Sequence, residues 1–279
     1  MLVPMIEILN KAKEEGYGVL APNVHNEDTV RACIEAAIEL ESPLILGVLP
    51  YVTKDLVSFG RMAGLLANEV RIPIALNLDH GDYYECCVQA IRGGFTGIMV
   101  DRSALSFDDN IKEVAYFKKI CAPINITVEA EIGKISDGNE YLKNREAFMT
   151  DPAVVKEFVD RSGVDCLAVS IGMAHGVYES EPIIDFDRLE KIKANVDCPL
   201  VFHGGSGSGD ANITKACKIG TQKVNMGTDA YLYGMKVLKE NWDDAEKFGI
   251  RRGHSYMIQG YKERVKHYMG LTGQIGKAK

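Results

Sequence analysis

Residues 73–81, PIALNLDHG, combine the two features that decide the fold. An apolar run at residues 73–78 leads directly into Asp79, His80 and Gly81. Apolar runs that are nearly continuous, rather than alternating with polar residues, are typical of parallel strands covered on both faces. Side chains with metal-binding or acid–base chemistry at the end of such a strand indicate a functional site at the carboxyl end of the strand.

The same pattern recurs along the whole chain. Eight apolar runs alternate with amphipathic stretches of helical length, and several of these stretches open with Asp at an N-cap or first-turn position. We predict strands at residues 18–23, 43–48, 73–78, 97–100, 126–131, 166–170, 199–202 and 223–226, and helices at 28–40, 55–69, 84–92, 109–119, 151–161 and 187–194. Eight such units predict an α/β fold, a single-domain (β/α)8 TIM barrel over residues 1–279, with an open doubly wound sheet as the alternative.

Composition narrows the class of protein. The chain has 279 residues, 46% of them hydrophobic and 25% charged, and its net charge of −7 is spread along the sequence. That balance argues against a nucleic-acid surface. The seven cysteines form no C-x-x-C pair and are odd in number, which favours a reducing compartment over a disulfide framework. No apolar run approaches the length of a membrane span, so we predict a cytoplasmic protein without a membrane partner.

Polar residues cluster where the predicted strands end. In a barrel these ends converge on one face. Three of the six histidines lie there, and three imidazoles that leave a fourth position open are a known catalytic-zinc arrangement. His25, near the end of the first strand, is a further candidate for lining the pocket. The residues at the strand ends are Asp79, His80, Asp101, Glu129, Glu131, His175, His203 and Asn225.

Zinc in this position would polarise a ketone carbonyl and stabilise the enediolate beside it. Cleavage of a carbon–carbon bond also needs a group that handles the proton of the hydroxyl on the carbon being split. Asp79 is the candidate for that role, and its alternative role is a carboxylate that orients a neighbouring histidine.

Two glycine-rich segments indicate phosphate binding. Residues 203–209, HGGSGSG, offer backbone N–H groups and hydroxyls, and residues 225–229, NMGTD, precede an apolar helix whose N-terminus would face an anion. Phosphate sites built from the loops after strands seven and eight recur in TIM barrels. The polar segment 134–150, which follows the fifth strand, is a candidate for a mobile lid.

Five motifs in the same order resemble the class II ketose-bisphosphate aldolases, near the tagatose-bisphosphate and deoxy-keto-gluconate-phosphate aldolases. These motifs are LDHG (78–81), VEAEIG (128–133), GMAHG (172–176), HGGSG (203–207) and NMGTD (225–229). The resemblance extends from APNVHN near the start of the chain to GQIGKA at its end. It implies a zinc-dependent aldolase that reversibly cleaves a phosphorylated ketose of the fructose- or tagatose-bisphosphate type to dihydroxyacetone phosphate and an aldehyde, and it implies a homodimer or homotetramer.

The resemblance also implies roles for individual residues. His80, His175 and His203 would hold zinc, while Asp101 and Glu131 would hold a second metal or the displaced zinc. Asp79 would be the acid–base group, Asn225 would contact the enediolate, and Glu140 on the polar segment would be the base that removes the proton next to the ketone. The substrate and its phosphate would be surrounded by Asn23, Gly176, Gly204, Ser206 and Thr228, with a monovalent cation (Na⁺ or K⁺) nearby.

Some positions depart from the family pattern. Leu49, Pro50 and Tyr51 stand where the family commonly has a hydroxyl residue and glycine, and Arg102 follows Asp101 in place of glycine. Ile258 aligns with an arginine that reaches the distal phosphate in relatives acting on bisphosphates. An aliphatic side chain cannot make that charge-assisted contact. Two alternatives therefore stay open: the same chemistry on a ketose monophosphate or keto-acid phosphate, and a non-catalytic phosphosugar-binding or scaffold subunit.

Overall fold

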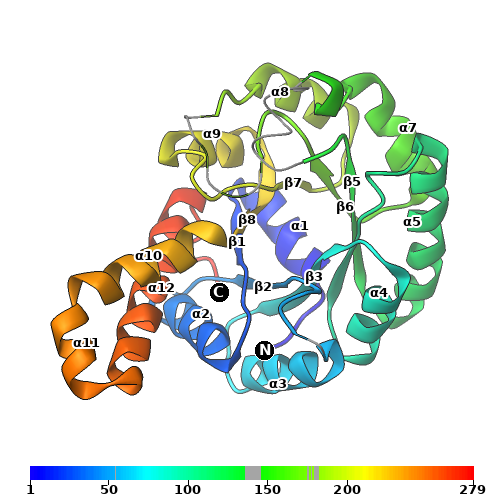
Figure 1. The fold of residues 1–279 in the computed structure, drawn as a ribbon. Coiled ribbons are helices and arrows are strands. Elements are labelled where there is room, and N and C mark those ends of the chain that lie inside the picture. Colours follow the sequence, from blue (N-terminus) through cyan, green and yellow to red (C-terminus); the bar gives the residue numbers. More distant parts are fainter. Residues whose placement is uncertain (54, 136–145, 175, 177, 179–181) are drawn as a thin grey trace.

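The eight strands of the computed structural model are parallel and form one sheet in the order β1-β8-β7-β6-β5-β4-β3-β2 (Figure 1). The structure describes residues 1–53, 55–135, 146–174, 176, 178 and 182–279. The strands are β1 (Val19–Pro22), β2 (Leu44–Val48), β3 (Ile74–Gly81), β4 (Gly97–Val100), β5 (Thr127–Ile132), β6 (Cys166–Val169), β7 (Leu200–Phe202) and β8 (Thr221–Met226).

The two outer strands of this order, β1 and β2, meet and close the barrel. Asn23 forms a parallel bridge with Gly47, and the backbone N–H of Val24 donates to the Gly47 carbonyl at 2.9 Å. The predicted single-domain (β/α)8 barrel is therefore confirmed, and the open doubly wound sheet is excluded. All eight predicted strands are present, with ends that differ by at most three residues.

The helices alternate with the strands and, apart from α1, lie outside the ring of strands (Figure 1). Asp55 and Asp151 cap α3 and α7 as predicted, by accepting from the backbone N–H of Ser58 and Ala153. The helices are α1 (Met5–Glu15), α2 (Glu27–Glu39), α3 (Leu56–Asn68), α4 (Tyr84–Arg92), α5 (Phe107–Cys121), η1 (Ala122–Ile124), α7 (Pro152–Ser162), α8 (Phe186–Asn195), α9 (Asp210–Ile219), α10 (Thr228–Glu240), α11 (Trp242–Phe248) and α12 (Ile250–Thr272). Among the described residues, no helix is both long and apolar enough to span a membrane.

The core has two parts. The larger part lies between the strands and the outer helices. The smaller part lies inside the barrel, where α1 inserts Met5 and Leu9 against inward-facing strand residues such as Val19 and Ala75. Figure 1 shows α1 within the ring of strands. Because the backbone N–H of Ile6 donates to Thr127 at the start of β5, α1 closes the amino-terminal end of the barrel and leaves the carboxyl end for a site.

Strand β3 is longer than its apolar run predicts. It continues through Gly81, which pairs with Val100 after a register shift that follows Leu78. His80 adopts a φ of 52°, a left-handed conformation that few non-glycine residues take. A Cβ on Gly81 would lie 2.5 Å from the Met99 carbonyl, so only glycine allows this close pairing with β4. The irregular end of β3 places Asp79 and His80 at the mouth of the barrel.

Candidate active site

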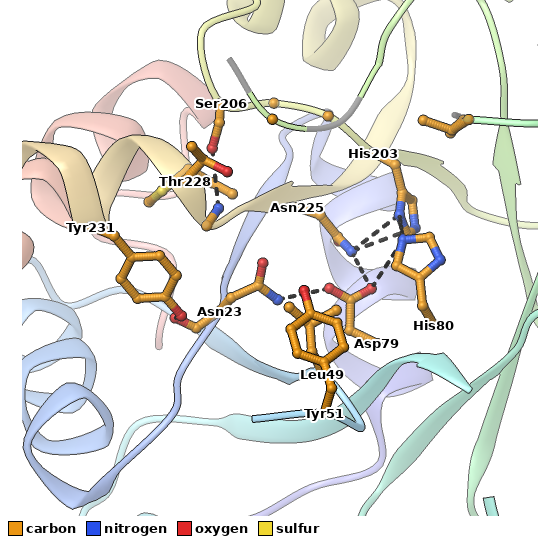
Figure 2. A pocket seen from close by; sticks show the side chains of 16 residues that line it. Asn23, Leu49, Tyr51, Asp79, His80, His203, Ser206, Asn225, Thr228 and Tyr231 are labelled. Atoms are coloured by element: carbon orange, nitrogen blue, oxygen red, sulfur yellow. Dashed lines mark hydrogen bonds and ion pairs between the residues drawn. The ribbon is translucent and has the colours of Figure 1, made fainter. Parts of the chain in front are cut away.

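Asp79 lies between two carboxamides at the carboxyl end of the barrel. Its Oδ2 accepts a hydrogen bond from Asn23 at 2.7 Å, and its Oδ1 accepts one from Asn225 at 2.8 Å (Figure 2). These amides come from the end of β1 and from β8, so three strands that are far apart in sequence hold one carboxylate. Asp79 is only 3% exposed. Burial works against its negative charge, but His80, His203 and Lys223 and the bond from Asn23 hold its pKa below the ordinary value.

His80 and His203 face each other at the same mouth. His80 Nε2 lies 3.1 Å from His203 Nδ1, and the ring centroids are 4.7 Å apart. The outer ring nitrogens contact carboxylates: His80 Nδ1 lies 2.7 Å from Asp101 Oδ2, and His203 Nε2 lies 2.9 Å from Glu129 Oε1. A carboxylate only accepts hydrogen bonds, so the outer nitrogens carry the hydrogens when the rings are neutral. The two inner nitrogens then present lone pairs to each other, an arrangement that a cation between the rings stabilises.

Four carboxylates surround these two imidazoles. His80 and His203 form a candidate ligand group with Asp79, and His80 forms a second one with Asp101 and Glu131. Among the described residues, Glu131 Oε2 is buried without a hydrogen-bond partner, while Oε1 accepts from the Ile135 N–H at 3.0 Å. A buried carboxylate oxygen without a donor, next to the imidazole of His80, is donor chemistry that zinc takes. The described residues therefore fit a metal ion.

The electrostatics of these groups favour a bound cation. Burial opposes a charged His80, but Asp79, Asp101 and Glu131 outweigh it and raise the pKa of His80 to about 9. Burial also opposes ionisation of Asp101, yet the hydrogen bonds from His80 and Ser103 hold its pKa well below the usual range. Burial, together with the nearby charge of Asp101, raises the pKa of Glu131 to about 8. The raised pKa values of His80 and Glu131 mean that this group of side chains holds protons at neutral pH, and a metal ion that binds here would displace them.

The two glycine-rich segments meet on the other side of Asn225 from the histidines (Figure 2). Ser206 Oγ accepts hydrogen bonds from the backbone N–H groups of Gly227 and Asp229, both at 3.1 Å, and so joins the loop after β7 to the N-terminus of α10. Gly204 has a φ of 66°, and a Cβ there would lie 2.4 Å from the Ala174 carbonyl. Thr228 opens α10 and lines the cavity. The helix N-terminus and the glycine loop together suit an anion such as phosphate.

A cavity of about 340 Å³ connects the histidines to these loops. Two walls of the cavity are largely apolar: Leu49 and Tyr51 after β2, and Ile135 after β5. The sixteen residues that line the cavity, all in the described part of the chain, include no Lys or Arg. They are Asn23, Leu49, Tyr51, Asp79, His80, Ile135, Gly176, His203, Gly204, Gly205, Ser206, Asn225, Met226, Gly227, Thr228 and Tyr231.

Most of the predicted site residues that lie in the described part of the chain converge on this end of the barrel. His175, the predicted third zinc ligand, and Glu140, the predicted base, lie outside the described residues. His25 is exposed, with its ring 5.1 Å from that of Tyr231, and is absent from the cavity lining. Ile258 lies on α12 and packs against the outer core rather than in the cavity. Arg102 turns away from the cavity and donates to the carbonyl oxygens of Gly81 and Asp101.

Three contributors were not predicted from the sequence. Lys223 is wholly buried and pairs with Glu129. The sequence places Glu129 at a strand end but does not indicate its role. Tyr231 and Tyr261 both donate to the Asn23 carbonyl, at 2.8 and 2.7 Å, and thereby hold the strand end that carries the Asn23 amide. A lysine within an apolar parallel strand is the one local signal that would have pointed to Lys223.

Comparison with known proteins agrees with this geometry. The family model described as fructose-bisphosphate aldolase class-II matches residues 3–277. The chain belongs to the class II fructose-bisphosphate aldolase family. It is therefore an aldolase, a lyase that acts on a carbon–carbon bond, and its family generally depends on a metal ion. The predicted family and enzyme class are confirmed.

Individual relatives cover the whole chain. The fructose-bisphosphate aldolase of Thermus caldophilus is 36% identical over 308 aligned positions, which span 100% of both chains. The probable fructose-bisphosphate aldolase of Bacillus subtilis (strain 168) is 35% identical and covers 86% of each chain. Among solved structures, the YdjI aldolase from Escherichia coli K12 superposes with a TM-score of 0.89 at 32% identity, and the match covers 100% of both chains.

Proposed function

We propose that this aldolase is zinc-dependent and reversibly cleaves a phosphorylated ketose to dihydroxyacetone phosphate and an aldehyde. The observation that carries the proposal is the position of Asp79. It is buried between two amide donors, with Oδ1 3.9 Å from Nε2 of His80, at the mouth of a closed barrel. One carboxylate is thus held next to a candidate metal site, where aldol cleavage needs a proton acceptor.

The metal proposal rests on donor chemistry. His80 and His203 would hold the ion through their facing nitrogens, with His175 as the third ligand, and Asp101 and Glu131 are the candidates for a second metal position. Bound zinc supplies Lewis-acid polarisation of a ketone carbonyl. These donors support zinc because imidazole and carboxylate groups are usual ligands of this metal.

The roles of the chain's own residues follow from their contacts. Asp79 takes the proton of the hydroxyl on the carbon that is split, while Asn23 and Asn225 hold its two oxygens in place. Asn225 lines the cavity, with its Nδ2 3.5 Å from Nδ1 of His203, and from this position it contacts the enediolate. Glu140 is the proposed base for the carbon next to the ketone.

The phosphate of the ketone half binds between Gly204, Ser206 and Thr228, with Gly176 at the edge of the same cavity. The amino end of α10 attracts the anion through the helix dipole, and the glycines let the backbone approach it closely. We propose a monovalent cation (Na⁺ or K⁺) beside the phosphate, because no lysine or arginine lies among the described residues that line the cavity.

The same observation favours a substrate with a single phosphate as the second candidate. Leu49 and Tyr51 form the cavity wall beside Asp79, where the aldehyde half of the substrate would lie (Figure 2). Neither side chain carries the cationic donors that bind phosphate. A ketose monophosphate, whose aldehyde half carries no anionic group, suits this wall better than fructose or tagatose bisphosphate, and a keto-acid phosphate is the other candidate with a single phosphate.

The test is a coupled assay for dihydroxyacetone phosphate with fructose 1,6-bisphosphate, tagatose 1,6-bisphosphate, fructose 1-phosphate and deoxy-keto-gluconate phosphate. We expect cleavage that a chelator abolishes and added Zn²⁺ restores. A monophosphate turned over far better than both bisphosphates supports the second candidate, whereas efficient cleavage of a bisphosphate refutes it. Zinc-loaded protein that cleaves none of the four substrates would contradict the proposed substrate class.

We also propose a homodimer or homotetramer. Leu232, Met235 and Trp242 are more than half exposed on α10 and α11, which extend away from the barrel (Figure 1). Burial of such a patch is a common reason for chain association. Light scattering that gives the mass of one chain at micromolar concentration would overturn this proposal.

A further inference from the structure

A wholly buried ion pair crosses the barrel interior beneath the candidate site. Lys223 Nζ lies 2.6 Å from Glu129 Oε2, and both side chains are 0% exposed. Glu129 is on β5 and Lys223 is on β8, with β6 and β7 between them in the sheet, so the pair spans the inside of the barrel. Removing two charges from water costs more free energy than such a pair usually returns, so stability is a weak reason for its presence.

The second oxygen of Glu129 connects the pair to the site. Oε1 lies 2.9 Å from Nε2 of His203, whose side chain is also 0% exposed. The lysine ammonium only donates and the carboxylate only accepts, which makes the order of donors and acceptors unambiguous. Lys223 therefore anchors one oxygen of Glu129, and the other oxygen receives the Nε2–H of His203.

This chain of contacts determines which way His203 presents its ring. With the hydrogen on Nε2, the lone pair is on Nδ1, the nitrogen that lies 3.1 Å from Nε2 of His80. Asp101 contacts the outer ring nitrogen of His80 in the way that Glu129 contacts that of His203, with Oδ2 2.7 Å from Nδ1. Carboxylates that contact the outer nitrogens of metal-binding histidines fix both tautomer and ring orientation.

We propose that Lys223 and Glu129 are positioning residues for His203: Lys223 anchors Glu129, and Glu129 holds His203 with Nδ1 toward the metal. The inference rests on the proposed metal site, but it assigns a new role to a pair that does not line the cavity. A purely structural pair would add packing and charge balance, and its replacement would leave the tautomer of His203 unchanged.

The variant Glu129→Gln separates these two roles. Its side chain has nearly the same shape, but one end is now a donor. Lys223 only donates, so the carboxamide oxygen must face Lys223 and the amide NH₂ must face His203. Nε2 then has to accept, and the hydrogen moves to Nδ1, which blocks the metal. We expect metal affinity to fall about 10- to 100-fold, the usual effect of replacing a group that orients a metal-binding histidine.

The double variant Glu129→Gln/Lys223→Met provides the rescue. Without Lys223 the carboxamide is free to rotate, and its oxygen can accept from Nε2–H again. We expect the double variant to bind metal at least about fivefold more tightly than Glu129→Gln, since the two replacements act on one contact chain. A structural role predicts the opposite order, because the double variant loses more of the original pair.

Asp165→Asn is the matched control. Asp165 pairs with Lys118 and accepts from the Val128 N–H at 2.8 Å, at the other end of β5 from the site. The Asp165→Asn variant removes a carboxylate from an ion pair but leaves the contact between Glu129 and His203 in place. We expect its metal affinity to stay within about twofold of the wild type, as for a site with no shared partner.

Two measurements on the 279-residue chain test the proposal. The dissociation constant for Zn²⁺ is obtained by competition with a chromophoric chelator, and the ring nitrogens of ¹⁵N-labelled histidine in the metal-free protein report the tautomer of His203. The expected result is the hydrogen on Nε2 in the wild type, on Nδ1 in Glu129→Gln, and on Nε2 again in the double variant. Equal affinity of Glu129→Gln and wild type, or no recovery in the double variant, overturns the proposal.

The ¹⁵N histidine spectrum of the wild type tests the proposal even if a variant does not fold or the protein binds no metal. If Glu129→Gln does not fold, the wild-type tautomer still decides, because a hydrogen on Nδ1 of His203 contradicts the positioning role. A wild-type protein that binds no metal would refute the proposed metal site, while its histidine spectrum would still test the contact with Glu129.

Discussion

Asp79 shows how uncharged donors make one carboxylate rigid. Each oxygen accepts from a carboxamide, Asn23 or Asn225, and an amide donates without carrying a full charge. Asn23 is itself held in place. Gly227 packs so closely against its side chain that a Cβ there would lie 2.4 Å from Oδ1, and two tyrosines donate to its backbone carbonyl. The carboxylate therefore keeps its orientation and retains lone pairs for a proton.

Replacement of Asp79 tests its role in the chemistry. Asp79→Asn keeps the shape but loses the proton acceptor, so we expect kcat to fall about 10²- to 10⁴-fold, the usual contribution of general acid–base catalysis. Metal content, measured by atomic emission, should stay near that of the wild type. Asp82→Asn, at an exposed position three residues further on, serves as the control and should keep full activity. An Asp79→Asn enzyme with more than a tenth of wild-type kcat would show that another group moves the proton.

At the scale of elements, α2 and α12 are joined by ion pairs on the outside of the barrel. Lys262 contacts Glu35 and Glu39, and Lys266 contacts Glu39 at 2.6 Å. Figure 1 shows the two helices side by side. Because α12 also carries the tyrosine that binds the Asn23 carbonyl, these surface contacts help to hold a helix that supports the site.

Acid should weaken this pairing in a defined pH range. The hydrogen bonds from Lys262 and Lys266 lower the pKa of Glu39 from 4.5 to about 2. A folded pKa below the unfolded one means that charged Glu39 stabilises the fold, fully above pH 4.5 and progressively less as the pH falls toward 2. We expect Glu39→Gln to have a slightly lower Tm than wild type at pH 7 and a smaller difference at pH 3, by differential scanning calorimetry.

Salt and a control variant complete that experiment. Glu39 is at the surface, so the Tm difference at pH 7 should also shrink in 1 M NaCl, where exposed charges are screened. Glu14→Gln, at an exposed position on α1, should change Tm equally little at both pH values. A Tm difference for Glu39→Gln that grows on acidification would contradict the assignment.

At the scale of the whole molecule, the barrel interior changes character from one end to the other. The amino-terminal end is apolar and filled by α1. The ion pair of Glu129 and Lys223 lies further along, next to strand neighbours Cys166 and Val201 that belong to the apolar interior. The carboxyl end holds the amides, histidines and carboxylates of the site. Stability and chemistry thus occupy opposite ends of one barrel.

A core substitution at the amino-terminal end should therefore affect stability alone. Leu9 on α1 is fully buried, and Leu9→Ala should lower the free energy of unfolding by about 2–5 kcal/mol through the cavity it leaves. The KM and kcat of the folded enzyme should not change, which is checked with urea unfolding and steady-state assays on the same preparation. Asn10→Ala, exposed on the same helix, is the control. A KM altered more than about threefold would show that the two ends are coupled.

The fold could be predicted almost completely because its signals are local. Apolar runs such as residues 97–100 and 166–170 mark strands directly, and Asp55 and Asp151 mark helix starts. Strand ends have weaker local signals: β3 continues through Gly81 because that glycine pairs closely with β4, a contact between different parts of the chain. The convergence of Asp79, His80, His203 and Asn225 followed from the strand ends once a barrel was assumed.

The sequence by itself determined the strand–helix alternation, the family and the polar residues at the strand ends. Only the tertiary structure decided which of them touch. Asn23 and Asn225 hold Asp79, Lys223 reaches Glu129 across the interior, and Ile258 stays outside the cavity. The physical reason is range: periodicity and capping act over a few residues, whereas these contacts depend on barrel closure, which brings β1, β3, β5 and β8 together from distant parts of the chain.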